Sequence, residues 1–290
     1  MKAHRILFPK QPTVAYVDYL LRAVREVREG QDSTIRLDLS GTSEVSALLI
    51  CFLCGLVDLA YERNSKVTII LPRNKRVSAA LKGVRYMSRT PSPPNIQITE
   101  TMCQLRKIAG YNPASIDDML TIISHNKPIF TPELRSDVRV ILTELLTNAM
   151  DHSGEKQCYV CVGAWGRSHN LHIAFLDFGV GIPKKLRTRY PPLEDDCEAV
   201  KALLEKGLTT RKGLEGGQGY RIIQEILKHN KGRLHIFSGT AKTVLRYDRG
   251  EYNYKKARRE FTGTCIDFQI NLAGSGYYEV IGSQSGEELF

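Results

Sequence analysis

The 290-residue chain lacks a long hydrophobic run: its longest nearly apolar stretch, Val45 to Val57, covers only 13 residues. A helix that spans a bilayer needs about 20 apolar residues, so no such helix is predicted. The N-terminus reads MKAHRILFPKQP and shows no secretory signal peptide. Extremes of composition are also missing, because hydrophobic residues make up 42% and charged residues 25% of the chain. This balance excludes disordered and collagen-like proteins.

Cysteine is sparse and odd in number, with seven residues and no predicted secretion signal. The simplest expectation is a cytoplasmic protein with reduced thiols. Two Cys-x-x-Cys pairs occur, but neither suits a metal. Cys51 and Cys54 lie in an apolar helical stretch, whereas Cys158 and Cys161 lie on a predicted strand, where positions three apart face opposite sides. These spacings argue against a zinc site.

Acidic residues are scarce in the first third of the chain. Residues 1–110 carry a net charge of +8, and the remaining residues contribute only +2 of the total of +10. A basic face of this kind favours an acidic partner or nucleic acid. It also serves simply as a solvated surface, and the sequence leaves both interpretations open.

The hydrophobic pattern divides the chain near residue 110, because turn-rich stretches at residues 89–94 and 110–113 interrupt it. Residues 1–110 alternate helix and strand, which predicts an α/β module with parallel strands. Residues 111–275 are typical of an α+β unit with helices on one face of a sheet, and residues 276–290 form a tail without a pattern. The predicted helices cover residues 14–27, 45–62, 74–87, 116–124, 132–152, 196–206 and 219–230, and the predicted strands cover residues 35–39, 67–71, 96–98, 157–165, 170–177, 233–237, 243–247 and 263–272.

Three motifs with chemical potential follow one another in the second segment. In the first, Glu144 and Asn148 stand four residues apart and share one face of the predicted helix. A carboxylate and a carboxamide at this spacing suit the activation of a nucleophile and the binding of a hydrated Mg²⁺, which takes few oxygen ligands and keeps several waters. Alone, such a pair more often belongs to a solvated helix face.

The second motif, Asp177 to Pro183, reads Asp-Phe-Gly-Val-Gly-Ile-Pro and follows a predicted strand. An aspartate at a strand end can accept a hydrogen bond from an exocyclic amine, and Gly179 and Gly181 allow the backbone to approach a flat ring.

The third motif, Gly213 to Tyr220, precedes a predicted helix, whose first backbone N–H groups attract an anion. It is neither a Walker A loop nor a dinucleotide fingerprint, because no Gly-Lys-Ser/Thr follows and no strand leads into it.

Together, the order and spacing of these motifs over residues 115–272 resemble the GHKL ATPase superfamily and its Bergerat ATP-binding fold. This superfamily includes gyrase, Hsp90, MutL and the bacterial histidine and anti-sigma kinases. Gly263-Thr264 resembles the family's closing Gly-Thr, and residues 207–211 resemble its ATP lid. The resemblance implies a Bergerat-fold α/β sandwich that binds ATP and Mg²⁺.

The resemblance also implies a role for each matched residue. Glu144 would be the general base, Asn148 the Mg²⁺ ligand and Asp177 the reader of adenine. The other residues implied to contact the nucleotide are Gly179, Gly181, Ile182, Thr210, Lys212, Gly216, Gly217, Gly219, Tyr220 and Thr264. The alternatives for a cation at the γ-phosphate are Arg211, Lys212 and Arg221. The stretch from Gly219 to Arg221 departs from the family's usual Gly-Leu-Gly.

Residues 33–87 resemble STAS domains, the small α/β partners of anti-sigma kinases. The Asp-Ser-Ser-Gly phosphorylation site of that family is missing here. Ser43 and Ser46 stand near its position, and a helix-capping role is the alternative interpretation.

The function expected from these resemblances is an Mg-ATP-dependent switch. ATP would close a lid at about residues 184–216, slow hydrolysis through Glu144 would reset it, and the change would act on a protein partner or drive homodimerisation. A serine/threonine kinase of the anti-sigma type and a non-enzymatic, ATP-gated scaffold or nucleic-acid-binding module are the alternatives. The basic runs at residues 184–189 and 255–259 are interpreted as a solvated lid and a solvated hairpin loop.

Overall fold

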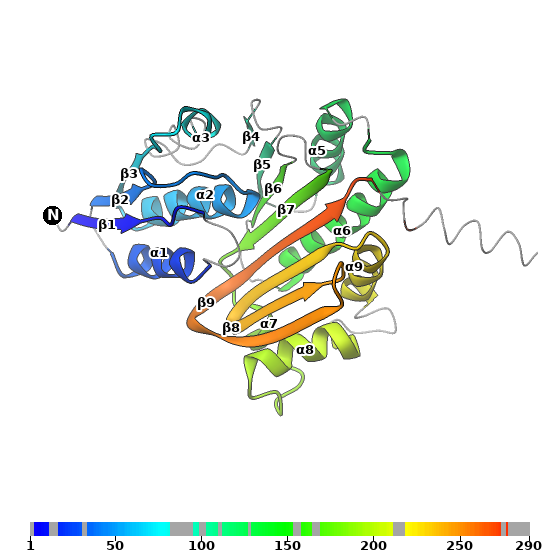
Figure 1. The fold of residues 1–290 in the computed structure, drawn as a ribbon. Coiled ribbons are helices and arrows are strands. Elements are labelled where there is room, and N and C mark those ends of the chain that lie inside the picture. Colours follow the sequence, from blue (N-terminus) through cyan, green and yellow to red (C-terminus); the bar gives the residue numbers. More distant parts are fainter. Residues whose placement is uncertain are drawn as a thin grey trace, which may run out of the picture.

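The computed structural model describes residues 3–11, 17–30, 34–81, 95–98, 103–109, 112–126, 129–152, 158–163, 169–210, 218–273 and 277. These residues form one three-stranded and one six-stranded sheet, with helices between and around them (Figure 1). The expected mixed α/β architecture is therefore confirmed. Within the described ranges, no helix combines the length and the apolar character needed to cross a membrane.

The N-terminal module, residues 3–81, is a small parallel sheet with crossover helices. Its elements are β1 (Ala3–Leu7), α1 (Val17–Glu29), β2 (Thr34–Asp38), α2 (Ala47–Glu62), β3 (Lys66–Ile70) and α3 (Lys75–Ala80). The strands lie in the order β1-β2-β3 and pair in parallel, as predicted. Ser46 caps α2, because its side chain accepts a hydrogen bond from the Leu49 N–H at 3.1 Å. The likeness to STAS domains stays a prediction.

The C-terminal unit, residues 95–273, is built on an antiparallel sheet with the strand order β4-β5-β6-β7-β9-β8. Its elements are β4 (Asn95–Ile98), β5 (Cys103–Ile108), α5 (Pro113–Asn126), α6 (Pro132–His152), β6 (Cys158–Gly163), β7 (Asn170–Asp177), α7 (Ile182–Arg187), α8 (Asp196–Lys206), α9 (Gln218–His229), β8 (Arg233–Arg246) and β9 (Glu251–Asn271). Such a sheet with helices packed on it is consistent with the expected Bergerat sandwich.

The boundary predicted near residue 110 needs correction, because two strands of the six-stranded sheet precede it. β5 pairs with β6 from Cys103 opposite Gly163 to Ile108 opposite Cys158, and β4 pairs with β5. The break in the pattern after residue 109 therefore ends a strand and does not separate two domains.

The last two strands are longer than predicted. β8 covers both short strands expected at 233–237 and 243–247, and the turn at 247–250 joins it to β9. Irregular pairing around Gly239 divides this hairpin into an inner part and an outer arm. The basic run at 255–259 lies within β9 on that arm, so its interpretation as a hairpin loop is wrong.

The second face of the six-stranded sheet is covered, contrary to the expectation of helices on one face only. Figure 1 shows α2 between the two sheets, and every residue from Ala47 to Ala60 is buried. The Cys51 thiol of α2 donates to the carbonyl oxygen of Ala174 in β7 at 3.5 Å. Helix and sheet approach closely at Gly55, where an added Cβ would lie 2.6 Å from the ring carbon Cε2 of Phe178.

Candidate functional site

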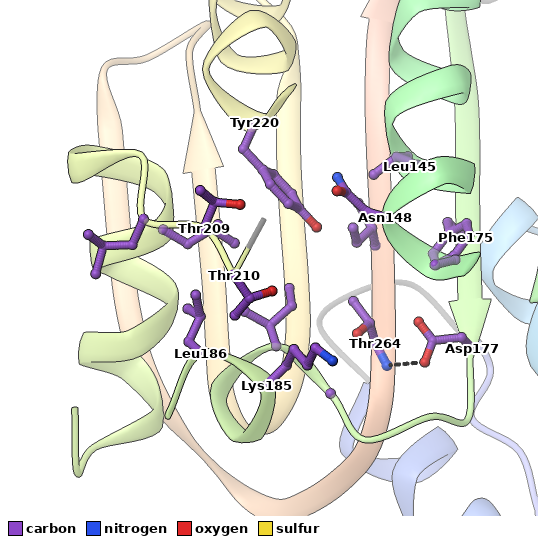
Figure 2. A pocket seen from close by; sticks show the side chains of 16 residues that line it. Leu145, Asn148, Phe175, Asp177, Lys185, Leu186, Thr209, Thr210, Tyr220 and Thr264 are labelled. Atoms are coloured by element: carbon purple, nitrogen blue, oxygen red, sulfur yellow. Dashed lines mark hydrogen bonds between the residues drawn. The ribbon is translucent and has the colours of Figure 1, made fainter. Parts of the chain in front are cut away.

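A pocket lies between α6, α7, α8 and α9 and the strands β7 and β9 (Figure 2). It is lined by Leu145, Asn148, Ala149, Phe175, Asp177, Gly181, Ile182, Lys185, Leu186, Leu203, Leu208, Thr209, Thr210, Tyr220, Thr264 and Ile266. Most of these side chains are apolar, and a few polar groups converge among them. This composition is typical of a small-molecule site, where apolar walls supply affinity and polar groups fix orientation.

Asp177 ends β7 and holds a fixed position in the pocket wall. It is 2% exposed, and it faces Thr264 as the last residue pair between β7 and β9. Its Oδ1 accepts hydrogen bonds from the backbone N–H groups of Gly179 at 2.8 Å and of Thr264 at 3.3 Å. The second motif and the Gly-Thr pair, 87 residues apart, thus meet at one carboxylate. A carboxylate held in this way presents a hydrogen-bond acceptor to the pocket.

The residues of the first motif face two different neighbours. Asn148 lines the pocket together with Leu145 and Ala149 of the same helix. Glu144, one turn earlier, lies against the beginning of α9, because a Cβ added to Gly219 would overlap its Oε2 atom. Glu144 is not among the residues that line the pocket as described. Asn148 therefore lies on the pocket wall, and Glu144 lies one helical turn away from it, next to the pocket.

The third motif reaches the pocket through Tyr220, the third residue of α9. Tyr220 is 8% exposed, and its hydroxyl points toward Asn148 in Figure 2. Burial raises the pKa of this hydroxyl above its usual value, and the nearby carboxylates of Asp177 and Glu144 raise it further. Tyr220 is therefore a neutral group whose hydroxyl can donate one hydrogen bond into the pocket.

Several predicted residues have other positions. Gly179 is not part of the pocket lining and acts through its N–H on Asp177. Lys212, Gly216 and Gly217 lie outside the described residues, as does Arg211. Arg221 lines a separate groove between α8, α9 and the β8–β9 hairpin. Gly181, Ile182, Thr210 and Thr264 line the pocket together, and their contact with a nucleotide stays a prediction.

Lys185 is the lining residue with a positive charge that the sequence analysis missed. Its side chain reaches into the pocket from α7, whereas its neighbour Lys184 is exposed (Figure 2). The interpretation of the basic run 184–189 as a solvated lid therefore needs correction at Lys185. No motif includes Lys185 and no helix is predicted at residues 182–187, so no local signal of the sequence places it at the site.

The described part of the predicted lid is a pair of helices tied to β8. Arg187 of α7 forms an ion pair with Asp196 of α8 and also donates to the carbonyl oxygen of Glu194 at 2.7 Å. Asp196 Oδ2 in turn accepts from the N–H of Thr240 at 2.6 Å and from its hydroxyl at 2.9 Å. Burial tends to raise the pKa of Asp196, but these bonds outweigh it and lower the pKa below its usual value.

Comparison with known proteins agrees with this geometry. Residues 133–274 match the family of histidine kinase-, DNA gyrase B-, and HSP90-like ATPases. The match begins in α6, ends just after β9, and includes all three motifs. It supports a GHKL-type, ATP-binding function for this part of the chain. No match is found among curated proteins.

Proposed function

We propose that this protein is an Mg-ATP-dependent switch that hydrolyses ATP slowly and controls a partner protein. One observation carries the proposal: residues from all three motifs, Asn148, Asp177 and Tyr220, line the same pocket. Thr264 joins them from β9, next to Asp177. A random association of short motifs would not bring four such residues to one cavity.

The base would lie at the Asp177 end of the pocket. An exocyclic amine donates to a carboxylate, and the apolar side chains of Phe175, Ile182 and Ile266 suit the faces of a flat ring. The backbone of Gly181 completes this wall. The adenine of ATP fits this combination of one acceptor and apolar walls.

The phosphates and Mg²⁺ would lie toward Asn148 and α9. A carboxamide oxygen is a ligand that Mg²⁺ accepts, and the ion keeps several waters, so one protein ligand beside phosphate oxygens suffices. The Glu144 carboxylate lies against Gly219 in the first turn of α9, so a side chain at this position would have to displace it. Asn148 would hold Mg²⁺, which would supply charge neutralisation for phosphoryl transfer, and Glu144 would accept the proton of the attacking water.

The switch would act through α7, α8 and the segment from Leu208 to Thr210, which line the pocket from the lid side. Tyr190 donates to the carbonyl oxygen of Thr209 at 3.2 Å, which links this segment to the end of α7. A nucleotide that contacts Lys185 and Thr210 would therefore change the surface formed by α7 and α8. That surface is the proposed site for a partner protein or for a second copy of the chain.

The test follows the γ-phosphate of labelled Mg-ATP in wild type and in Glu144→Gln. The amide keeps the size of the side chain, so the contact with Gly219 is preserved. Removal of a general base costs roughly 100-fold or more in rate, so we expect phosphate release to fall by about that factor while ATP affinity changes little. Glu251→Gln, an exposed position at the beginning of β9, is the matched control.

The alternative functions appear as distinct outcomes of the same experiment. Transfer of the label to the protein or to an added polypeptide would show that the protein is a protein kinase and not an ATPase. ATP binding with neither free phosphate nor labelled protein would indicate a ligand-gated scaffold. Salt-sensitive nucleic-acid binding by that form would assign a role to the basic residues. Absence of ATP binding would overturn the proposal.

A further inference from the structure

Arg28, in the last turn of α1, extends from the N-terminal module to the wall of the proposed nucleotide site. Its Nη2 donates to the carbonyl oxygens of Thr262 at 3.1 Å and of Phe178 at 3.4 Å. Phe178 directly follows Asp177, and Thr262 stands two residues before Thr264. One guanidinium group thus joins β9 to the end of β7, next to the pair that carries the base-reading carboxylate.

Phe178 is held on the same side. Its ring lies 5.6 Å from the guanidinium carbon of Arg28, which is within cation–π range. It also forms edge contacts with Tyr159, at a centroid distance of 6.3 Å, and with Phe261, at 6.1 Å. The backbone of α2 at Gly55 lies directly against the Phe178 ring. Residues of both modules therefore enclose one side chain of the Asp-Phe-Gly motif.

Neighbouring residues at the end of a strand point to opposite faces. Asp177 accordingly faces the pocket, and Phe178 faces the N-terminal module. The two N–H donors to Asp177 belong to Gly179 and Thr264, each within two residues of a carbonyl group bound by Arg28. A shift of these carbonyl groups would displace both donors and, with them, the carboxylate.

We propose that the N-terminal module is part of the nucleotide site and that Arg28 is a positioning residue for the segment Asp177 to Gly179, which would bind the base. This inference rests on the proposed function. Arg28 touches no nucleotide; it holds Asp177 in the conformation that binds, and such preorganisation increases affinity. By linkage, a partner that displaces α1 weakens ATP binding by the same factor by which ATP weakens binding of that partner.

The experiment compares Arg28→Ala with Arg25→Ala. Arg25 lies one turn earlier on the same helix and pairs with Glu29 on the surface, so both variants lose one charge. Affinity is measured by calorimetry for Mg-ATP and for inorganic triphosphate with Mg²⁺. Hydrogen bonds from a charged donor contribute enough that we expect roughly tenfold weaker ATP binding in Arg28→Ala. Triphosphate has no base, so its affinity is expected to stay at the wild-type value in both variants.

Arg28→Lys separates positioning from charge. The ammonium group can donate to carbonyl oxygens and lie over the Phe178 ring, but it sits on a flexible stem and is more strongly hydrated than the planar guanidinium. We expect it to restore part of the ATP affinity. In steady-state kinetics, Arg28→Ala is expected to raise KM and leave kcat unchanged, because Glu144 and Asn148 lie on a different element.

A second readout needs no nucleotide. Amide hydrogen exchange of Gly179 and Thr264 is expected to accelerate in Arg28→Ala but not in Arg25→Ala. If Arg28 only stabilised the fold, Arg28→Ala would lower the free energy of unfolding and leave ATP affinity and this local exchange unchanged.

The outcomes separate the two proposals. Wild-type protein that binds no ATP would overturn the proposed function and, with it, the nucleotide role of Arg28. Wild-type ATP affinity in Arg28→Ala would overturn only the inference on Arg28. An equal loss of ATP and triphosphate affinity would also overturn it, since the base would then have no part in the effect.

Discussion

The two faces of the six-stranded sheet are both buried, but they differ in what covers them. On the face toward α6 and α9, Leu171, Ile173 and Phe175 of β7 pack in a core that leaves a pocket at its edge. On the opposite face, Ala174 and Leu176 pack with α2 in a core continuous with the N-terminal module. Alternate residues of one strand therefore face the core beside the pocket and the core shared with the N-terminal module.

The two faces also differ in the side chains that they carry. The pocket face exposes a few polar groups among apolar walls. The α2 face is filled with small and apolar side chains, such as Cys161, Ala174 and Cys265, which let the helix approach the sheet closely. Besides the hydrogen bond of the Cys51 thiol, two groups of polar contacts among the described residues lie on the α2 face. Asp58 with Lys107 and Tyr159 lies on one side, and Arg28 with Phe178 and Thr262 lies next to the pocket.

The largest effect is expected for the buried group around Asp58. Its Oδ2 accepts from Lys107 at 2.7 Å and from the Tyr159 hydroxyl at 2.6 Å, and its side chain is only 4% exposed. Lys107→Met leaves this carboxylate without its cation and is expected to cost about 3 kcal/mol of the free energy of unfolding. Urea unfolding measures the loss.

The control for this variant is Lys66→Met, at an exposed position of β3. The triple variant Asp58→Leu, Lys107→Met and Tyr159→Phe is expected to regain stability, because it removes all three polar groups together and leaves none of them without its partner. ATP affinity should not change in either variant. A large loss of affinity would contradict the division of the α2 face into a structural and a site-positioning group.

Sequence patterns predict most of this fold where hydrophobic periodicity is strong. The apolar run of α2 and the parallel strands β2 and β3 are clear from it. β5 and the outer arm of β9 escape prediction because their residues are largely polar, and their strand structure depends on pairing with β6 and β8. The cover on both faces of the sheet can be predicted from β6. All six of its residues are apolar or small, which indicates a strand buried on both faces.

The candidate site shows the same limit. Asp177, Asn148 and Thr264 could be found because their motifs keep fixed spacing. Lys185 belongs to no motif, and only the position of α7 against the sheet brings it to the pocket. Arg28 lies 150 residues before Phe178, so a contact between them cannot be derived from local pattern.

On the pocket face, Asp177→Asn is expected to weaken ATP binding by roughly 100-fold, because it replaces a charged acceptor by a group that presents a donor to the amine. An ATP analogue without the 6-amino group tests the contact itself. Wild type should bind this analogue poorly, whereas Asp177→Asn should no longer distinguish it from ATP. If the variant kept the full preference for ATP, Asp177 would not read the amine.

Lys185→Met tests the cation of the pocket wall. The substitution keeps the length and the apolar stem of the side chain and removes the charge, so we expect ATP affinity to fall by roughly five- to tenfold through loss of one charge-assisted contact. Lys184→Met is the matched control, because Lys184 is the neighbour of Lys185 in the chain and its side chain is exposed. Equal effects of the two variants would show that general surface charge, not a contact in the pocket, attracts the nucleotide.

The smallest effect is expected from Asp196, and only in acid. Its pKa in the folded protein lies below the usual 3.8, so its bonds to Thr240 and Arg187 stabilise the fold fully above that value. The contribution is lost as the pH falls through the folded-state pKa, since protonation then removes the acceptor charge. Urea unfolding between pH 2 and pH 6 should therefore show a shallower acid decline in Asp196→Asn than in wild type. Glu198→Gln, on the exposed side of the same helix, should follow the wild-type curve. If Asp196→Asn declined as steeply in acid as wild type, the contacts of Asp196 with Thr240 and Arg187 would not hold the lid helices to β8.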